Sequence, residues 1–137
     1  MTKRLFFAIP LLAASFAYGQ SEEKAIRSMV SRQTSAANAA DVAGYMATVD
    51  PKSPGYGQTK SAMEAVFHTY KLKFKSESIK ILSIKGTTAQ VQMVTLTTRI
   101  SGPKFRDNRV KMTANLIKRS GKWLMSTAKV DKFDYLN

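Results

Sequence analysis

Residues Arg109–Ile117 read RVKMTANLI, and this stretch has the most regular alternation in the chain. Its apolar side chains fall on every second residue, at Val110, Met112, Ala114 and Leu116. Successive side chains of a β-strand point to opposite faces, so this pattern predicts a strand with one buried face and one exposed face. We expect the face that carries Val110 and Leu116 to lie in the core.

Three short turn signals place further strands around this one. Each contains glycine: KGT at 85–87, SGP at 101–103 and SGK at 120–122. They divide the second half of the chain into four strands, the first over about 76–85 and the last over about 123–133. Four strands joined by short turns predict an antiparallel meander. In the second strand the apolar residues occupy odd-numbered positions up to Met93 and even-numbered positions from Val94 onward. This switch predicts either a bulge or burial on both faces of the strand.

The first half of the chain has the three-to-four-residue apolar spacing of helices instead. The predicted helices cover about 22–37, 42–49 and 59–70, with a loop rich in Pro, Gly and Ser at 52–58. Ser21 and Asp41 stand at the positions of helix caps. Helices followed by an antiparallel meander predict an α+β fold, in which three N-terminal helices pack against a curved four-stranded antiparallel sheet.

The corner between the first two helices resembles a known superfamily. It reads NAAD at 38–41, with Tyr45 and Asp50 downstream, and is similar to the helix junction of nuclear transport factor 2-like proteins. GKW at 121–123 and SGPKFRDNR at 101–109 add to the likeness. The resemblance implies a cone-shaped, cystatin-like roll of the SnoaL-like or ketosteroid isomerase-like kind, in an uncharacterised secreted bacterial member. It implies no single function, because the superfamily includes enzymes, transport factors and plain binding domains.

The start of the chain has the layout of a secretory signal peptide. Lys3 and Arg4 precede an apolar run over 5–17, and Ala17 and Gly19 are small residues at the −3 and −1 positions of a cleavage site. The run is too short to span a bilayer. We therefore expect a signal peptide at 1–19 and one domain at 20–137, in a protein that is secreted or periplasmic.

The net charge and the lack of cysteine limit which binding partners and which kinds of site are expected. The formal net charge is +13, and loss of the two basic residues of the signal would lower it by two, to +11. Such a charge favours anionic partners, although it also serves solubility. The chain has no cysteine, which excludes disulfides, thiol nucleophiles and thiolate metal sites. We expect no cofactor, no metal, no nucleic-acid partner and, after signal removal, no integral membrane segment.

Asp50, Tyr45 and Tyr56 form the one grouping with catalytic potential. A carboxylate base beside a tyrosine donor in an apolar pocket is the arrangement that ketosteroid isomerase uses. The same residues also serve as a helix end and as ordinary core aromatics. His68, the single histidine, follows Glu64 by four residues and has no companions at metal-ligand spacing. Asp50, Tyr45 and His68 are therefore only candidates, and no catalytic residue is assigned.

Basic side chains supply the remaining candidates for ligand binding. Lys71, Lys73 and Lys75 alternate with apolar residues, so in an extended chain they project from one face. Arg106 and Arg109 lie just before and at the start of the third strand. These five side chains, with Tyr45 and Tyr56, are the predicted ligand-binding residues. Basic side chains also protect sheet edges from pairing with other chains, which is the alternative role.

These features predict an exported, non-catalytic binding domain for a small molecule or an anionic component of the cell envelope. Two alternatives stay open. One is an enzyme of the isomerase or cyclase type that uses an Asp–Tyr pocket. The other is a structural dimerisation module, in which the protein pairs with itself as a homodimer.

Overall fold

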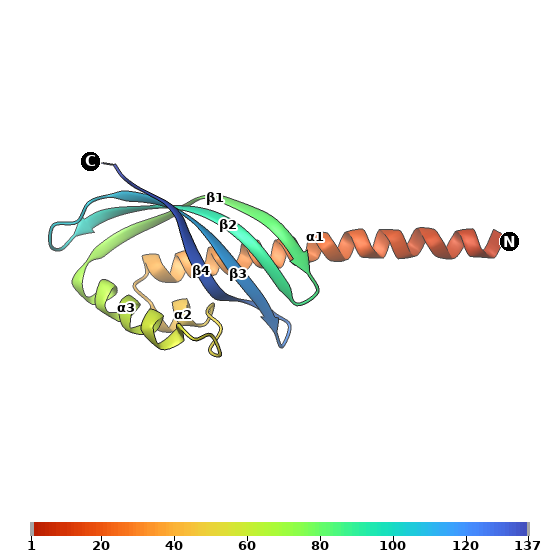
Figure 1. Ribbon diagram of the computed structural model, residues 1–137, viewed down its shortest axis with the longest axis horizontal. Coiled ribbons are helices and arrows are strands. Elements are labelled where there is room, and N and C mark those ends of the chain that lie inside the picture. Colours follow the sequence, from red (N-terminus) through yellow and green to blue (C-terminus); the bar gives the residue numbers. More distant parts are fainter. Residues whose placement is uncertain (1, 137) are drawn as a thin grey trace.

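Three helices pack under a single curved sheet in the computed structural model, which describes the backbone of residues 2–136 and the side chains of residues 19–136 (Figure 1). The elements, in chain order, are α1 (Thr2–Asn38), α2 (Val42–Met46), α3 (Tyr56–Thr69), β1 (Lys71–Lys85), β2 (Thr88–Ser101), β3 (Asn108–Arg119) and β4 (Lys122–Tyr135). The four strands lie in the order β1-β2-β3-β4, and all neighbours are antiparallel. The predicted α+β architecture is confirmed.

The helix boundaries differ from those predicted. α1 begins at Thr2, so Ser21 lies inside the helix and caps nothing there. The first residue and the side chains of residues 2–18 lie outside the described part of the chain, so signal cleavage stays a prediction. α2 ends at Met46 and does not continue to Val49. The reason is that Val49 leaves the helix to form a parallel bridge with Met125 on β4.

The sheet is curved by bulges in its two outer strands. β1 is one strand of 15 residues, so the predicted strand over 76–85 is only its second part. The β1–β2 register shifts between Ser76 and Ser78, and the β3–β4 register shifts opposite Lys111 and Asn115. An extra residue in one strand bends it and strengthens its twist. β2 pairs with β3 without a shift, so β2 has no bulge after Met93 in this pairing. The second of the two predicted alternatives is closer, because the apolar residues that follow Met93 are half-buried on the convex face.

The core lies between α1 and the concave face of the sheet. Ile26 and Met29 of α1 are fully buried against Val91, Ala114 and Leu116 of the two central strands. The predicted facing of β3 is therefore correct. Val110 and Met112, on the same face of β3, are only half-buried, because they border a cavity and not packed core.

The corner that carries the family resemblance fixes α1 to the sheet. The Asn38 side chain donates to the Phe74 carbonyl at 2.9 Å and accepts from the Phe74 amide at 2.7 Å, so it completes the backbone pairing at the start of β1. Ala40 turns the chain with φ of 53°. Asp41 then caps α2, because its carboxylate accepts from the Gly44 amide at 2.9 Å, as predicted. This corner turns the chain so that α2 lies beside α1 and α3, on the helical side of the molecule (Figure 1).

Candidate functional site

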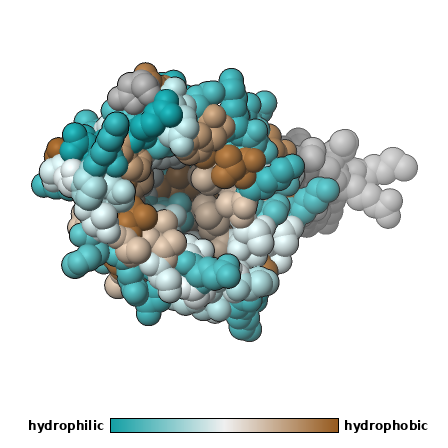
Figure 2. Space-filling view, turned by 60° about the vertical axis from the view of Figure 1, so that its left-hand side comes forward, coloured by the Kyte–Doolittle hydropathy of each residue, from teal (hydrophilic) through white to brown (hydrophobic). Residues whose placement is uncertain are grey.

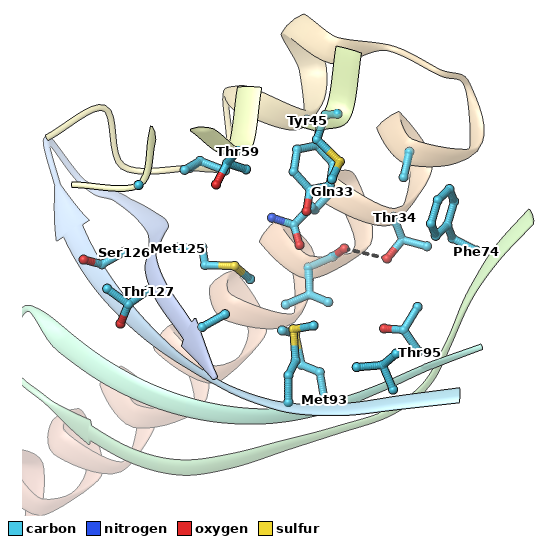
Figure 3. Close-up of a pocket in the computed structure, with 18 of the residues that line it drawn as sticks. Gln33, Thr34, Tyr45, Thr59, Phe74, Met93, Thr95, Met125, Ser126 and Thr127 are labelled. Atoms are coloured by element: carbon cyan, nitrogen blue, oxygen red, sulfur yellow. Dashed lines mark hydrogen bonds between the residues drawn. The ribbon is translucent and has the colours of Figure 1, made fainter. Parts of the chain in front are cut away.

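A cavity of about 530 Å³ lies between the helices and the concave face of the sheet. Figure 2 shows it as a hollow bordered by hydrophobic and weakly polar side chains, with hydrophilic residues on the surrounding surface. Every element contributes to it: Gln33 comes from α1, Tyr45 from α2 and Thr59 from α3, and all four strands line the rest (Figure 3). The volume falls in the range of small-molecule sites in proteins.

The cavity wall is apolar with neutral polar groups. Met93, Met112 and Met125 of three neighbouring strands project into it, and Phe74 lies on the β1 side. The polar groups are hydroxyls and one carboxamide, and within the described part of the chain no lining residue carries a charged side chain. Transfer of an ion into such a space is costly without a partner charge. The wall is therefore suited to a neutral, mostly apolar molecule.

Hydrogen bonds fix the side chains at the polar end of the cavity, which Gln33 and Tyr45 form. Gln33 Nε2 donates to Thr48 Oγ1 at 2.9 Å, and Thr48 Oγ1 donates to the Tyr45 carbonyl at 2.6 Å. The Tyr45 ring packs edge-on against Phe67, with ring centroids 6.3 Å apart. Burial raises the pKa of the Tyr45 hydroxyl above its ordinary value of 10.0, so the phenol is protonated at neutral pH with a wider margin than a free tyrosine has. Tyr45 thus presents an uncharged hydroxyl inside the cavity.

Asp50 does not line the cavity. Its carboxylate is almost completely buried, accepts from Arg119 Nε at 2.9 Å and Nη2 at 3.3 Å, and also accepts from the Lys52 amide at 3.1 Å. The hydrogen bonds from Arg119 hold the pKa of Asp50 below its ordinary value, against the opposing effect of burial. A carboxylate with this pairing is a poor general base, and its contacts join the segment after α2 to the end of β3.

The other sequence candidates lie apart from one another. His68 is exposed on α3, and no cluster of metal-ligating side chains exists among the described residues. Tyr56 begins α3 beside the cavity-lining Gly55 but does not itself line the cavity. The grouping of Asp50, Tyr45 and Tyr56 therefore does not form one pocket.

The basic candidates lie on β1, on β3 and in the loop that precedes β3. Lys71, Lys73 and Lys75 are exposed on β1, as predicted from their spacing. Arg109 is not available as a simple anion site, because its guanidinium forms a two-point hydrogen-bonded pair with Glu77. Arg106 lies over the Tyr135 ring, 3.8 Å from its centroid.

Two features of the structure were missed from the sequence. Gln33 lies within the predicted first helix, and it lines the cavity although it is not among the predicted site residues. Glu22, at the start of the predicted first helix, is buried and accepts from Lys118 Nζ at 2.7 Å and Trp123 Nε1 at 2.8 Å. Its spacing of four residues before Ile26 places it on the apolar face of α1. That spacing is the signal that would have identified it.

Comparison with known proteins identifies the family. The sequence model of the C-terminal domain of anti-sigma-I factor RsgI9 matches residues 28–136. The chain belongs to this family. The anti-sigma-I factor RsgI9 of Acetivibrio thermocellus is 30% identical over 79 residues, which cover 58% of this chain and 11% of that protein. This member of the RsgI9 C-terminal domain family thus spans about a tenth of the length of its curated relative.

Solved structures show which fold this family domain has. A Mycobacterium tuberculosis protein of unknown function superposes with a TM-score of 0.75 at 13% identity, covering 87% of this chain and 75% of the other. A nuclear transport factor 2-like protein from Pseudomonas putida gives 0.69 at 14% identity, covering 81% and 86%. A Nostoc punctiforme protein with a cystatin-like fold gives 0.66 at 14% identity, covering 82% and 90%. The expected nuclear transport factor 2-like, cystatin-like fold is confirmed.

Among the residues that the structure describes, no helix has the length and apolar character needed to cross a bilayer.

Proposed function

We propose that this protein is a non-catalytic binding domain whose cavity takes a neutral, largely apolar small molecule. The observation that carries the proposal is the uncharged wall of a cavity of about 530 Å³. Burial of apolar ligand surface against such a wall supplies the binding free energy, and a few neutral hydrogen-bonding groups supply orientation. The curated relative is named an anti-sigma factor, and we propose that the shared domain is a ligand-responsive part of such a regulator.

The enzyme alternative is less well supported by the geometry. It requires a base that faces bound ligand, and Asp50 is instead paired with Arg119 outside the cavity lining. An isomerase of the ketosteroid type needs its carboxylate beside the substrate carbon. Tyr45, by contrast, lines the cavity with a protonated hydroxyl, which suits ligand orientation without proton transfer.

The test uses N-phenyl-1-naphthylamine, a neutral apolar dye that becomes fluorescent when it leaves water. We expect saturable binding to the wild-type protein. Thr95→Trp should abolish it, because Thr95 lines the cavity and the larger ring fills the space. Val94→Trp is the matched control, since Val94 immediately precedes Thr95 on β2 and points to the convex face. Equal binding by the two variants, or no binding by the wild type, would overturn the proposal.

A second candidate function rests on the basic face of β1. Lys71, Lys73 and Lys75 are exposed there, and within the described residues none of them forms an ion pair with a carboxylate. Lys75 does lie close enough to Glu77 to help lower the pKa of that carboxyl. We propose weak association of this face with anionic lipid or acidic polymer, driven by a charge attraction that salt screens.

The test of this second candidate is co-sedimentation with phosphatidylglycerol vesicles and retention on an acidic polysaccharide column, at low and high salt. Replacement of all three lysines of β1 by glutamine should reduce association at low salt several-fold. The control replaces three exposed lysines of the helical side by glutamine: Lys24, Lys52 and Lys60. Equal losses in both triple variants would show a nonspecific effect of net charge and would contradict the proposed face.

We also propose that the protein is exported, on the strength of the basic start, the apolar run and the small residues before Gln20. Intact-mass analysis of protein recovered from outside the cytoplasm should give a chain that begins at Gln20. A mature envelope form that still begins at Met1 would contradict the proposal.

A further inference from the structure

The polar end of the cavity has a fixed hydrogen-bonding order. Thr48 has a single hydroxyl proton, and that proton is donated to the Tyr45 carbonyl at 2.6 Å. Thr48 Oγ1 must therefore accept from the Gln33 side chain, so the NH₂ group of Gln33 faces Thr48 at 2.9 Å. This arrangement leaves the Gln33 carbonyl oxygen as an acceptor that is not used by Thr48.

The Tyr45 hydroxyl provides the complementary donor. It takes part in none of the side-chain hydrogen bonds among the described residues, although the ring is held by its contact with Phe67. Tyr45 and Gln33 both line the cavity, and Figure 3 shows their polar ends directed toward the same part of it. One donor and one acceptor are therefore presented together to a ligand.

We propose that the Tyr45 hydroxyl and the Gln33 carbonyl oxygen select a neutral ligand that carries a hydroxyl or carboxamide group, which donates and accepts at the same point. This inference rests on the proposed binding function of the cavity and adds the chemical class of the ligand. A hydrocarbon would leave both groups without partners. A carboxylate would face the Gln33 oxygen and meet no positive charge in the described cavity wall.

The neighbouring Thr34 supplies an internal control. It also lines the cavity, but its hydroxyl donates to the Val30 carbonyl of its own helix at 3.0 Å, as the dashed line in Figure 3 shows. Because that proton is already used, Thr34 has much less to offer a ligand than Tyr45 has.

The experiment displaces N-phenyl-1-naphthylamine with three naphthalenes of similar size: 2-naphthol, 2-methylnaphthalene and 2-naphthoate. We expect 2-naphthol to bind roughly tenfold more tightly than 2-methylnaphthalene, the difference that one or two neutral hydrogen bonds provide. The anionic 2-naphthoate should bind most weakly. Tyr45→Phe should remove the preference for 2-naphthol, because it weakens 2-naphthol binding and no longer leaves a hydroxyl without a partner beside 2-methylnaphthalene. Gln33→Leu should act in the same direction.

Thr34→Val should keep the preference. If 2-naphthol is still preferred in both Tyr45→Phe and Gln33→Leu, or if Thr34→Val loses the preference equally, the assignment is wrong. Binding of the dye and all three compounds without preference would overturn this inference alone. Absence of any binding would overturn the proposed function as well, so the two failures are distinguishable.

Discussion

The Asp50–Arg119 pair should respond unequally to loss of its two partners. The Asp50 side chain is 3% exposed and the Arg119 side chain is 36% exposed. After Asp50→Asn, Arg119 can turn toward water, and the amide oxygen keeps one acceptor. After Arg119→Met, the buried carboxylate keeps only the bond from the Lys52 amide at 3.1 Å. The second change should therefore destabilise the protein more than the first.

The magnitudes follow from the bonds that are lost. Hydrogen bonds to charged groups contribute about 1.5–3 kcal/mol. Because Arg119 is partly exposed, we expect Asp50→Asn to lower the free energy of unfolding by about 2 kcal/mol. A buried charge left without its partner costs about 3 kcal/mol or more, which is the expected loss for Arg119→Met. For a chain of this size, 1 kcal/mol corresponds to roughly 3 °C in Tm. We expect Tm losses of about 6 °C for Asp50→Asn and about 9 °C or more for Arg119→Met by calorimetry.

The pH dependence has a definite sign. The pKa of Asp50 is lowered in the folded protein, so its contribution is fully present above the unfolded pKa of about 3.9 and is lost as pH falls through the folded value. The difference in stability between the wild type and Asp50→Asn should be constant above about pH 5 and should shrink below pH 4. Lys122→Gln, in the same turn, controls for removal of a cation from this region. An NMR titration that gives Asp50 a pKa above that of free aspartate, or a larger loss for Asp50→Asn than for Arg119→Met, would refute the reasoning.

Three further predictions concern the framework around the site. Leu116→Ala should cost about 2–5 kcal/mol in chemical denaturation, because Leu116 is 2% exposed, whereas the exposed neighbour Asn115→Ala should cost much less. Glu22→Ala should shift the emission of the single tryptophan and destabilise more than Glu22→Gln, which keeps an acceptor for the indole; equal effects would contradict the role of that bond. Gly102→Ala should lower Tm, because φ is 107° and the new Cβ would lie 2.9 Å from a carbonyl oxygen of α3, whereas Gly57→Ala has open space and a helical position and should be neutral or stabilising.

The sequence determined the order of the elements and the facing of the central strand. Alternation is a local property of the backbone, so the pattern at 109–117 predicted which side chains of β3 face inward without knowledge of any partner. The Asp41 cap was predicted for the same reason, since its carboxylate bonds an amide only three residues away. The resemblance at 38–41 also indicated the correct fold.

Element boundaries that depend on distant contacts could not be predicted. α2 stops early because the Asp50 amide donates to the Met125 carbonyl at 2.8 Å and the Met125 amide donates to the Thr48 carbonyl at 2.8 Å. This backbone pairing joins residues far apart in the sequence, and it outweighs the local helical spacing of the segment. The bulges of β1 and β4 similarly depend on which residues of the neighbouring strand lie opposite.

Tertiary structure also decided which polar residues meet in the site. Asp50 and Tyr45 are five residues apart and were grouped from sequence, but the bridge to β4 turns Asp50 toward Arg119, so that of these two residues only Tyr45 lines the cavity. Gln33 joins Tyr45 only because the corner at 38–41 folds α2 back beside α1. The sequence therefore determined local geometry and the fold class. The chemistry of the cavity depends on which residues from different elements come together there, and long-range packing decides this.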